Sequence, residues 1–210
     1  MKHMDEISSV RRGAFTLIEI LVVMTIMVLM ITMGLGVGSA WKAQKLTSQA
    51  RLLSADLSEA VLMAQKDNYP VQFRFYMLPD ELGAGSADGM RAFQVARLTG
   101  YDPNTQQPIY KTLTEVRYFE DDIMLMESPN YNSLANLKPS DPVASDPAVR
   151  GKQRSYRSFM FLPNGTTTLP RTPDAVFTLV KEHDVKISGT LPDNYRSVTL
   201  QPVTAKATMY

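Results

Sequence analysis

Residues 15–40 form an apolar run of 26 residues that contains a single charged side chain, Glu19. As an α-helix this run would extend for about 39 Å, which is enough to cross a bilayer. Lys2, Arg11 and Arg12 precede it, and the positive-inside bias places such residues on the cytoplasmic side. The sequence therefore predicts a single-pass transmembrane helix at 15–40, with the N-terminus inside the cell and the bulk of the chain outside.

Glu19 is out of place in an ordinary membrane anchor. A carboxylate in an apolar helix costs about 2.5–3.5 kcal/mol at the centre of a bilayer and less near its surface. Two simpler interpretations leave Glu19 unexplained: a secretory signal cut after Ala40, and an uncleaved membrane anchor. The position of Glu19 instead predicts that its side chain has a partner.

The residues around the start of the run carry a specific motif. Arg11 to Glu19 read R-R-G-A-F-T-L-I-E, which resembles the prepilin processing site of type IV pilins and type II secretion pseudopilins. The resemblance implies that prepilin peptidase removes a leader, residues 1–14, and methylates the new N-terminus. Cutting after Ala14 leaves Phe15 first and Glu19 fifth, as is usual in this family. Cutting after Gly13, the residue type usual at this site, remains the alternative.

The same resemblance implies a location, a set of partners and a function. The chain would be a structural subunit, of the minor type, in a type IV pilus or type II secretion pseudopilus. It would sit in the bacterial inner (cytoplasmic) membrane, with its globular domain in the periplasm, and would assemble into a filament through Glu19 and the N-terminal helix. Its partners would be the prepilin peptidase, other pilins or pseudopilins, the inner-membrane assembly platform and membrane lipid.

The helix is expected to continue beyond the membrane as an amphipathic segment at 41–68. Seven apolar residues recur at three- and four-residue spacing and lie within one arc of about 100°, the pattern of a helix packed on a core. They are Leu46, Ala50, Leu53, Leu57, Ala60, Val61 and Ala64. The helix should end at Asp67-Asn68-Tyr69-Pro70, because Pro disfavours helical geometry in the residue before it.

Residues 69–210 have the pattern of a β-rich globular domain. Val71–Met77 alternates, with Val71, Phe73, Phe75 and Met77 on one face. The further strands predicted are Ala92–Thr99, Ile109–Phe119, Tyr156–Leu162, Thr166–Leu169, Val176–Val180 and Ser197–Pro202. Hairpin turns are expected at Tyr101–Asn104 and Pro163–Gly165. Loops are expected at Leu78–Met90 and near 128–155, the second being an insertion or a mobile loop.

This order of elements predicts an α+β fold: a long N-terminal helix packed on a small antiparallel sheet, which is the pilin-like architecture. The short strand after the helix and the F-L-P-N-G turn, Phe161 to Gly165, most resemble minor pseudopilins and FimT-like minor pilins. The sequence contains no cysteine. Since many major pilins staple their C-terminal region with a disulfide, this absence favours a minor or pseudopilin-like subunit.

Net charge argues against nucleic acid as a general partner. Without the leader the chain has 22 − 3 = 19 basic and 21 − 2 = 19 acidic residues, so nucleic-acid binding is unlikely in bulk. One local cluster is basic: Arg150, Lys152, Arg154 and Arg157. A solvated loop is the simpler interpretation, and the alternative is a surface-displayed minor pilin that binds DNA, or a secreted substrate.

No catalytic constellation is evident. His183 beside Asp184 lacks a nucleophile to complete a site, and Glu120-Asp121-Asp122 is typical of a charged loop. Asp141 and Asp146 lack the spacing of a calcium loop. The sequence therefore predicts a protein that is not an enzyme and that has no cofactor and no metal site.

Overall fold

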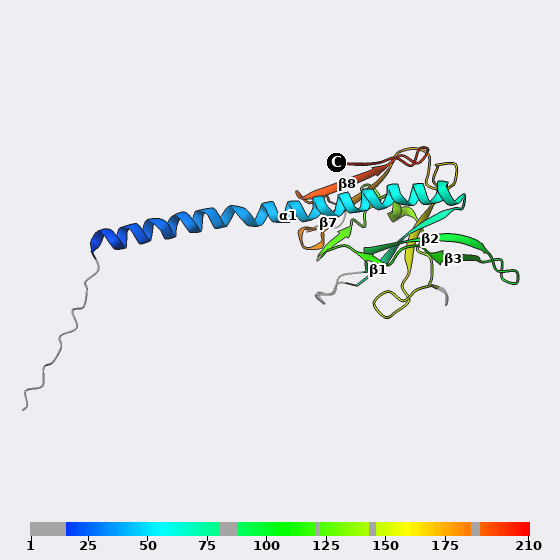
Figure 1. Cartoon of the computed structure of the whole chain (residues 1–210), viewed down its shortest axis with the longest axis horizontal. Coiled ribbons are helices and arrows are strands. Elements are labelled where there is room, and N and C mark those ends of the chain that lie inside the picture. The colour runs from blue at the N-terminus through cyan, green and yellow to red at the C-terminus, as the bar shows by residue number, and fades with distance from the viewer. Residues whose placement is uncertain (1–15, 80–87, 121, 143–145, 186–189) are drawn as a thin grey trace, which may run out of the picture. The chain divides into compact units, whose positions relative to one another are not determined.

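The computed structural model describes residues 16–79, 88–120, 122–142, 146–185 and 190–210, and of residues 33–42 it describes the backbone alone (Figure 1). The chain divides into two compact units, Met1–Lys42 and Ala43–Tyr210. The predicted leader, 1–14, and Phe15 lie outside the described residues. The predicted α+β class is confirmed: helix α1 is followed by nine strands that form an antiparallel sheet in the described part of the chain.

Helix α1 covers Leu17–Asp67, close to the predicted 15–68. Its first turn is capped by Thr16, whose Oγ1 accepts the Glu19 N–H at 3.3 Å. Its end is set by Asn68, which has a φ of 54°. Asn tolerates this left-handed conformation, and Pro70 prevents the helix from continuing.

The predicted membrane segment falls partly on residues whose side chains are not described, 33–40. Within the residues whose side chains the structure describes, no helical segment is both long enough and apolar enough to cross a membrane.

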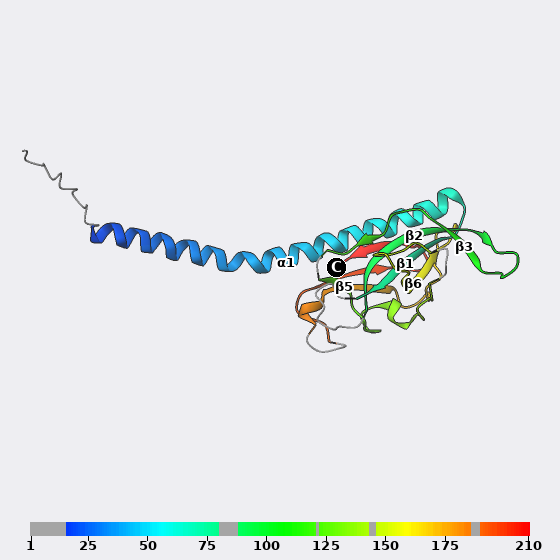
Figure 2. The ribbon, with the colours of Figure 1, turned by 90° about the horizontal axis from the view of Figure 1, so that it is seen from below.

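In the second unit, α1 lies against one face of the sheet (Figures 1 and 2). All seven residues of the predicted apolar stripe are buried there. Six of them have no exposed surface, and Val61 is 9% exposed. Each buried leucine of this stripe contributes about 1.5–3 kcal/mol of hydrophobic stabilisation. The predicted packing face of the helix is therefore confirmed. Leu62, which lies outside the stripe, is 64% exposed.

The sheet has the strand order β6-β1-β2-β5-β7-β8-β9, and β3 and β4 also pair with β2. The strands are β1 (Val71–Leu78), β2 (Gly89–Tyr101), β3 (Pro108–Thr112), β4 (Arg117–Tyr118), β5 (Ile123–Leu125), β6 (Tyr156–Phe161), β7 (Ala175–Lys181), β8 (Tyr195–Leu200) and β9 (Ala207–Met209). Every pairing is antiparallel, from Val71 opposite Arg97 in β1–β2 to Leu200 opposite Ala207 in β8–β9.

The core between α1 and the sheet is rich in phenylalanine. Phe73 of β1 lies with its ring centroid 5.4 Å from that of Phe93 and 6.0 Å from that of Phe159, both in stacked geometry. Phe177 of β7 stacks on Phe75 and Phe159. These contacts come from four strands, so aromatic packing ties both halves of the sheet to the same core.

Several strand predictions were wrong in detail. The predicted strand 109–119 is two strands, β3 and β4, because the N–H groups of Leu113 and Thr114 both donate to the Val95 carbonyl and break the ladder. Thr166–Leu169 is not a strand and makes one isolated bridge, Thr167 to Phe161. Strands β5 and β9 were not predicted. The Asp102 turn between β2 and β3 is confirmed, since its carboxylate accepts the N–H groups of Asn104 and Thr105 at 2.8 and 3.0 Å.

The predicted loop at 128–155 has structure in its described parts. It contains a 3-10 helix, η1 (Ser133–Asn136), capped by the buried Asn132 side chain. Isolated bridges link Asn132 to Phe177 and Ser140 to Tyr156. Buried Val149 packs with Tyr76, Leu78 and Tyr156. This segment therefore covers residues of β1 and β6 that do not belong to the core under α1. Of the predicted loop 78–90, residues 80–87 lie outside the described part.

Candidate functional site

The described apolar part of α1, Leu17 to Ile31, presents hydrophobic side chains on all sides. Thirteen large apolar residues are between 47% and 83% exposed: Leu17, Ile18, Ile20, Leu21, Val22, Val23, Met24, Ile26, Met27, Val28, Leu29, Met30 and Ile31. The hydroxyl groups of Thr25 and of Thr32, the residue after this part, are satisfied within the helix, as Thr25 donates to the Leu21 carbonyl at 2.7 Å and Thr32 to the Leu29 carbonyl at 2.9 Å. A contiguous exposed apolar surface of this kind marks a contact with protein or membrane.

Glu19 is the one charged residue of this surface. It lies exposed in the first turn of α1, beside Ile20, Val23, Met24 and Met27. A carboxylate in the first turn is favoured by the helix dipole, but that effect is worth only about 0.3–1 kcal/mol. Of the other residues predicted to matter here, Gly13, Ala14 and Phe15 lie outside the described part of the chain.

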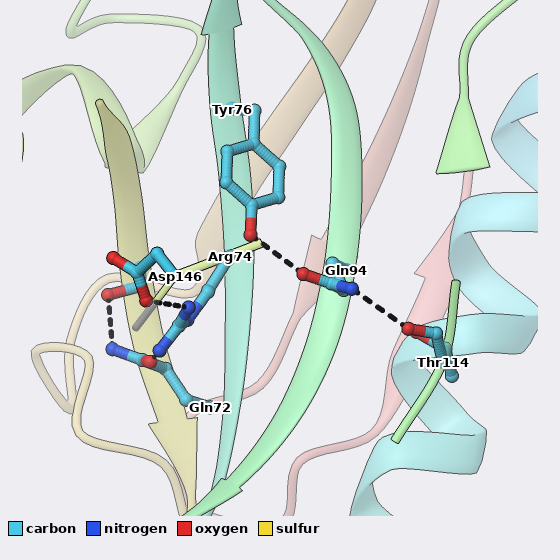
Figure 3. Close-up of polar contacts among 7 residues, drawn as sticks. Gln72, Arg74, Tyr76, Gln94, Thr114 and Asp146 are labelled. Atoms are coloured by element: carbon cyan, nitrogen blue, oxygen red, sulfur yellow. Dashed lines mark hydrogen bonds and ion pairs between the residues drawn. The ribbon is translucent and has the colours of Figure 1, made fainter. Parts of the chain in front are cut away.

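A second candidate site is a polar network on the face of β1 opposite to the phenylalanine core (Figure 3). Arg74 lies at its centre with 1% of its side chain exposed, and donates from Nη1 to Asp146 Oδ1 at 2.8 Å. Its Nε donates to Gln72 Oε1 at 2.7 Å, and Gln72 Nε2 donates to Ser158 Oγ at 2.8 Å. The network thus joins β1, β6 and the segment 128–155.

Two tyrosine rings enclose the Arg74 guanidinium. Its central carbon lies 4.8 Å from the ring centroid of Tyr110 and 4.6 Å from that of Tyr156. Burial opposes the charge on Arg74, but the negative charge of Asp146 favours it, and the pKa of Arg74 is raised overall. Burial raises the pKa of Tyr156 to about 12, although Arg74 acts in the opposite direction. Arg74 therefore stays charged and Tyr156 neutral at physiological pH.

Tyr76, whose hydroxyl also interacts with Arg74, begins a further chain of hydrogen bonds. Its hydroxyl donates to Gln94 Oε1 at 2.7 Å, and Gln94 Nε2 donates to the Thr114 carbonyl at 2.9 Å (Figure 3). Sequence alternation placed Gln72, Arg74 and Tyr76 on one face but gave no sign of the segment that buries them. The arrangement fixes this segment on the sheet; it offers no nucleophile with an adjacent base.

The four basic residues predicted as a cluster have different surroundings. Arg157 pairs with Glu127 at 3.2 Å, and Arg150 stacks over the ring of Tyr118 at 5.1 Å. Arg154 is partly buried and Lys152 is exposed. Since Arg157 already has a carboxylate partner, these contacts favour structural roles. A nucleic-acid contact stays a prediction.

Two of the acidic residues noted in the sequence form ion pairs, and the histidine lies exposed on the surface. Asp146 is the partner of Arg74, and Asp122 accepts from Lys181 Nζ at 3.2 Å. His183 is exposed in the 3-10 helix η2 (Glu182–Asp184). Among the described residues, no three His, Cys, Asp or Glu side chains are grouped to hold a metal ion.

Asp56 is a buried carboxyl that should make stability depend on pH. Burial raises its pKa, although Arg117, at 2.5 Å, acts in the opposite direction. A carboxyl with a raised pKa binds its proton more tightly when folded, so its contribution to stability is full at low pH and is lost as the pH rises through the folded pKa. We expect Asp56→Asn to reduce the gain in unfolding free energy between neutral pH and about pH 4, the ordinary range of an unfolded carboxyl, measured by denaturant titration. Asp174→Asn, at an exposed carboxyl, is the control; equal pH profiles for wild type and Asp56→Asn would contradict this expectation.

Comparison with known proteins finds no matching family model, no matching curated protein and no matching solved structure.

Proposed function

We propose that this chain is a minor structural subunit of a type IV pilus or a type II secretion pseudopilus, assembled through α1 after prepilin peptidase has removed the leader. The observation that carries this proposal is a change, along α1, in how the apolar side chains are distributed around the helix. From Leu17 to Ile31 the helix exposes apolar side chains on all sides, whereas from Leu46 to Ala64 it buries a single stripe against the sheet. A helix that is apolar all round is a buried helix.

The two surfaces match the two environments that such a subunit needs. The second unit supplies a folded domain, and Leu17–Ile31 supplies a surface to be covered by lipid before assembly and by neighbouring subunits afterwards. The basic leader ahead of it favours a cytoplasmic N-terminus and therefore a domain on the periplasmic side of the inner membrane. The partners proposed are accordingly prepilin peptidase, other pilins or pseudopilins, the assembly platform and lipid.

The proposal is tested by the N-terminus of the processed chain. When the full chain is produced together with a prepilin peptidase, mass spectrometry is expected to find a mature chain that starts at methylated Phe15. Ala14→Gly should be cut at least as well, and Ala14→Leu should block cleavage because a bulky side chain does not fit a pocket shaped for a small residue. Ser9→Leu, elsewhere in the leader, is the matched control.

Each other outcome is informative. A mature chain that starts at Ala14 would move the cleaved bond to Gly13–Ala14 and leave the family proposal standing. A chain that starts at Trp41 would identify a secretory signal and refute the proposal, as would a chain that keeps residues 1–14 in the presence of active peptidase.

A further inference from the structure

The β2–β3 hairpin and Tyr156 of β6 enclose a cavity beside the network around Arg74. Gly100 and Tyr101 of β2 pair with β3 and extend beyond β1, whose own pairing with β2 starts at Val71 (Figure 1). The cavity has a volume of about 400 Å³, within the range of small-ligand pockets, about 300–1,000 Å³. The described residues that line it are Asp102, Thr105, Gln107, Pro108, Ile109, Tyr110 and Tyr156.

Two tyrosine hydroxyls are available to a ligand in this cavity. Tyr156 is only 6% exposed, and a buried tyrosine hydroxyl usually has a hydrogen-bond partner. Within the described part of the chain, however, neither the Tyr156 hydroxyl nor the Tyr110 hydroxyl has one. Neither oxygen is fully buried. Their partner is therefore water or a ligand.

The tip of the hairpin adds further hydrogen-bonding groups. Both turn hydrogen bonds of Asp102 go to its Oδ1, which leaves Oδ2 as an acceptor that faces no other described partner. The exposed side-chain amide of Gln107 can both donate and accept. Pro108 and Ile109, the second of which is 47% exposed, supply apolar surface between these groups. The cavity thus combines donors, acceptors and apolar surface within a small volume.

The charges around the cavity favour a neutral ligand. The Arg74 guanidinium carbon lies 4.8 Å from the ring centroid of Tyr110 and 4.6 Å from that of Tyr156, so a cation placed against the same rings would be repelled. The Asp102 carboxylate, whose pKa is lowered by the N–H groups of Thr105 and Asn104, would repel an anion. Among the described lining residues there is no lysine or arginine to attract one.

We propose that this cavity binds a neutral saccharide. Sugar hydroxyls both donate and accept, which matches the tyrosine hydroxyls, the Gln107 amide and the free oxygen of Asp102. The C–H groups on the face of a sugar ring pack against aromatic rings, whose faces carry partial negative charge. Tyr101, which is 61% exposed and lies opposite Pro108 in the hairpin, extends the aromatic surface beside the cavity. This inference concerns the second unit alone and does not depend on assembly through α1.

The test is saturation-transfer nuclear magnetic resonance on the full chain in lipid nanodiscs. Maltose, cellobiose, lactose and N,N′-diacetylchitobiose are the ligands offered, and empty nanodiscs give the background. We expect at least one of these disaccharides to receive saturation from the protein. The double variant Gln107→Ala, Tyr110→Phe removes an amide and a hydroxyl but keeps the ring beside Arg74. It should weaken the affinity for that disaccharide by about tenfold.

The matched control Gln44→Ala, Tyr195→Phe changes the same residue types at exposed positions outside the cavity and should bind like wild type. If the double variant does not fold, Gln107→Ala alone changes only an exposed side chain and should still weaken binding by about threefold. Decaproline is a competing ligand, because extended proline-rich peptides also bind aromatic grooves.

Three results would overturn the proposal. The first is no saturation transfer to any of the four disaccharides. The second is unchanged affinity in the folded variant, which would place the binding elsewhere on the chain. The third is binding of decaproline, and of no disaccharide, that is lost in the folded variant; it would assign the cavity to a peptide.

Discussion

Replacing Arg74 with Met is expected to lower the free energy of unfolding of the β-domain by about 3–5 kcal/mol, the largest effect on stability that we expect from a single polar residue here. The substitution leaves Asp146, whose side chain is 7% exposed, buried without its cation. It also removes the donor to Gln72 and the group stacked between Tyr110 and Tyr156. The measurement is denaturant unfolding of the full chain in detergent, followed by near-ultraviolet circular dichroism.

Two further variants separate the lost ion pair from a general effect of the substitution. Arg171→Met removes an exposed arginine and should change stability by less than about 0.5 kcal/mol. Adding Asp146→Leu to Arg74→Met removes the carboxylate that has lost Arg74 and should restore part of the loss, because an apolar pair can replace a buried ion pair at little cost. An Arg74→Met chain as stable as Arg171→Met would show that the network contributes little.

The helix and its packing face were predictable because they follow from a local repeat. Leu46, Leu53 and Leu57 recur at helical spacing whatever the rest of the chain does, and Pro70 ends the helix by a steric effect on its neighbour. The alternation in β1 and the Asp102 turn are likewise properties of a few consecutive residues. Each of these predictions is confirmed.

The missed elements depend on contacts between distant residues. β5 and β9 have three residues each, too few for a periodic pattern, and are strands only because β7 and β8 lie beside them. The break between β3 and β4 depends on the Val95 carbonyl, which accepts two N–H groups. No local pattern encodes such a pairing.

The polar network was missed for a related reason. Alternation assigns Gln72, Arg74 and Tyr76 to the face away from the Phe73 core, and such a face is usually solvated. Here the segment 128–155 covers it and supplies Asp146. A signal was present in the sequence, since an arginine between two strongly hydrophobic residues in a central strand is unusual. Its partner, however, lies 72 positions away.

Replacing Glu19 with Val is expected to leave export and leader cleavage intact and to reduce incorporation into filaments, or into complexes with partner pilins, by about tenfold or more. The physical reason is charge pairing. Cleavage before Phe15 creates an α-amino group that is positively charged near neutral pH. In an assembled bundle of apolar helices, both this amine and Glu19 would be enclosed, and an unpaired enclosed charge is costly. Pairing Glu19 with the amine of a neighbouring subunit satisfies both charges and sets the axial offset between subunits.

The competing explanation is a pair within one chain, since the first and fifth mature residues lie one helical turn apart. An intrachain pair sets no axial offset between subunits, so its loss should reduce assembly less than the loss of a pair between subunits. The readout is the fraction of the subunit recovered with sheared filaments or with co-purified partner pilins, normalised to processed chain. Glu59→Val, at an exposed glutamate of the same helix in the second unit, is the matched control and should assemble like wild type. Normal assembly of Glu19→Val would refute the intersubunit pair, whereas loss of leader cleavage would place the role of Glu19 in processing. A tenfold or greater reduction in the assembly of correctly cleaved chain is the result expected from pairing between subunits.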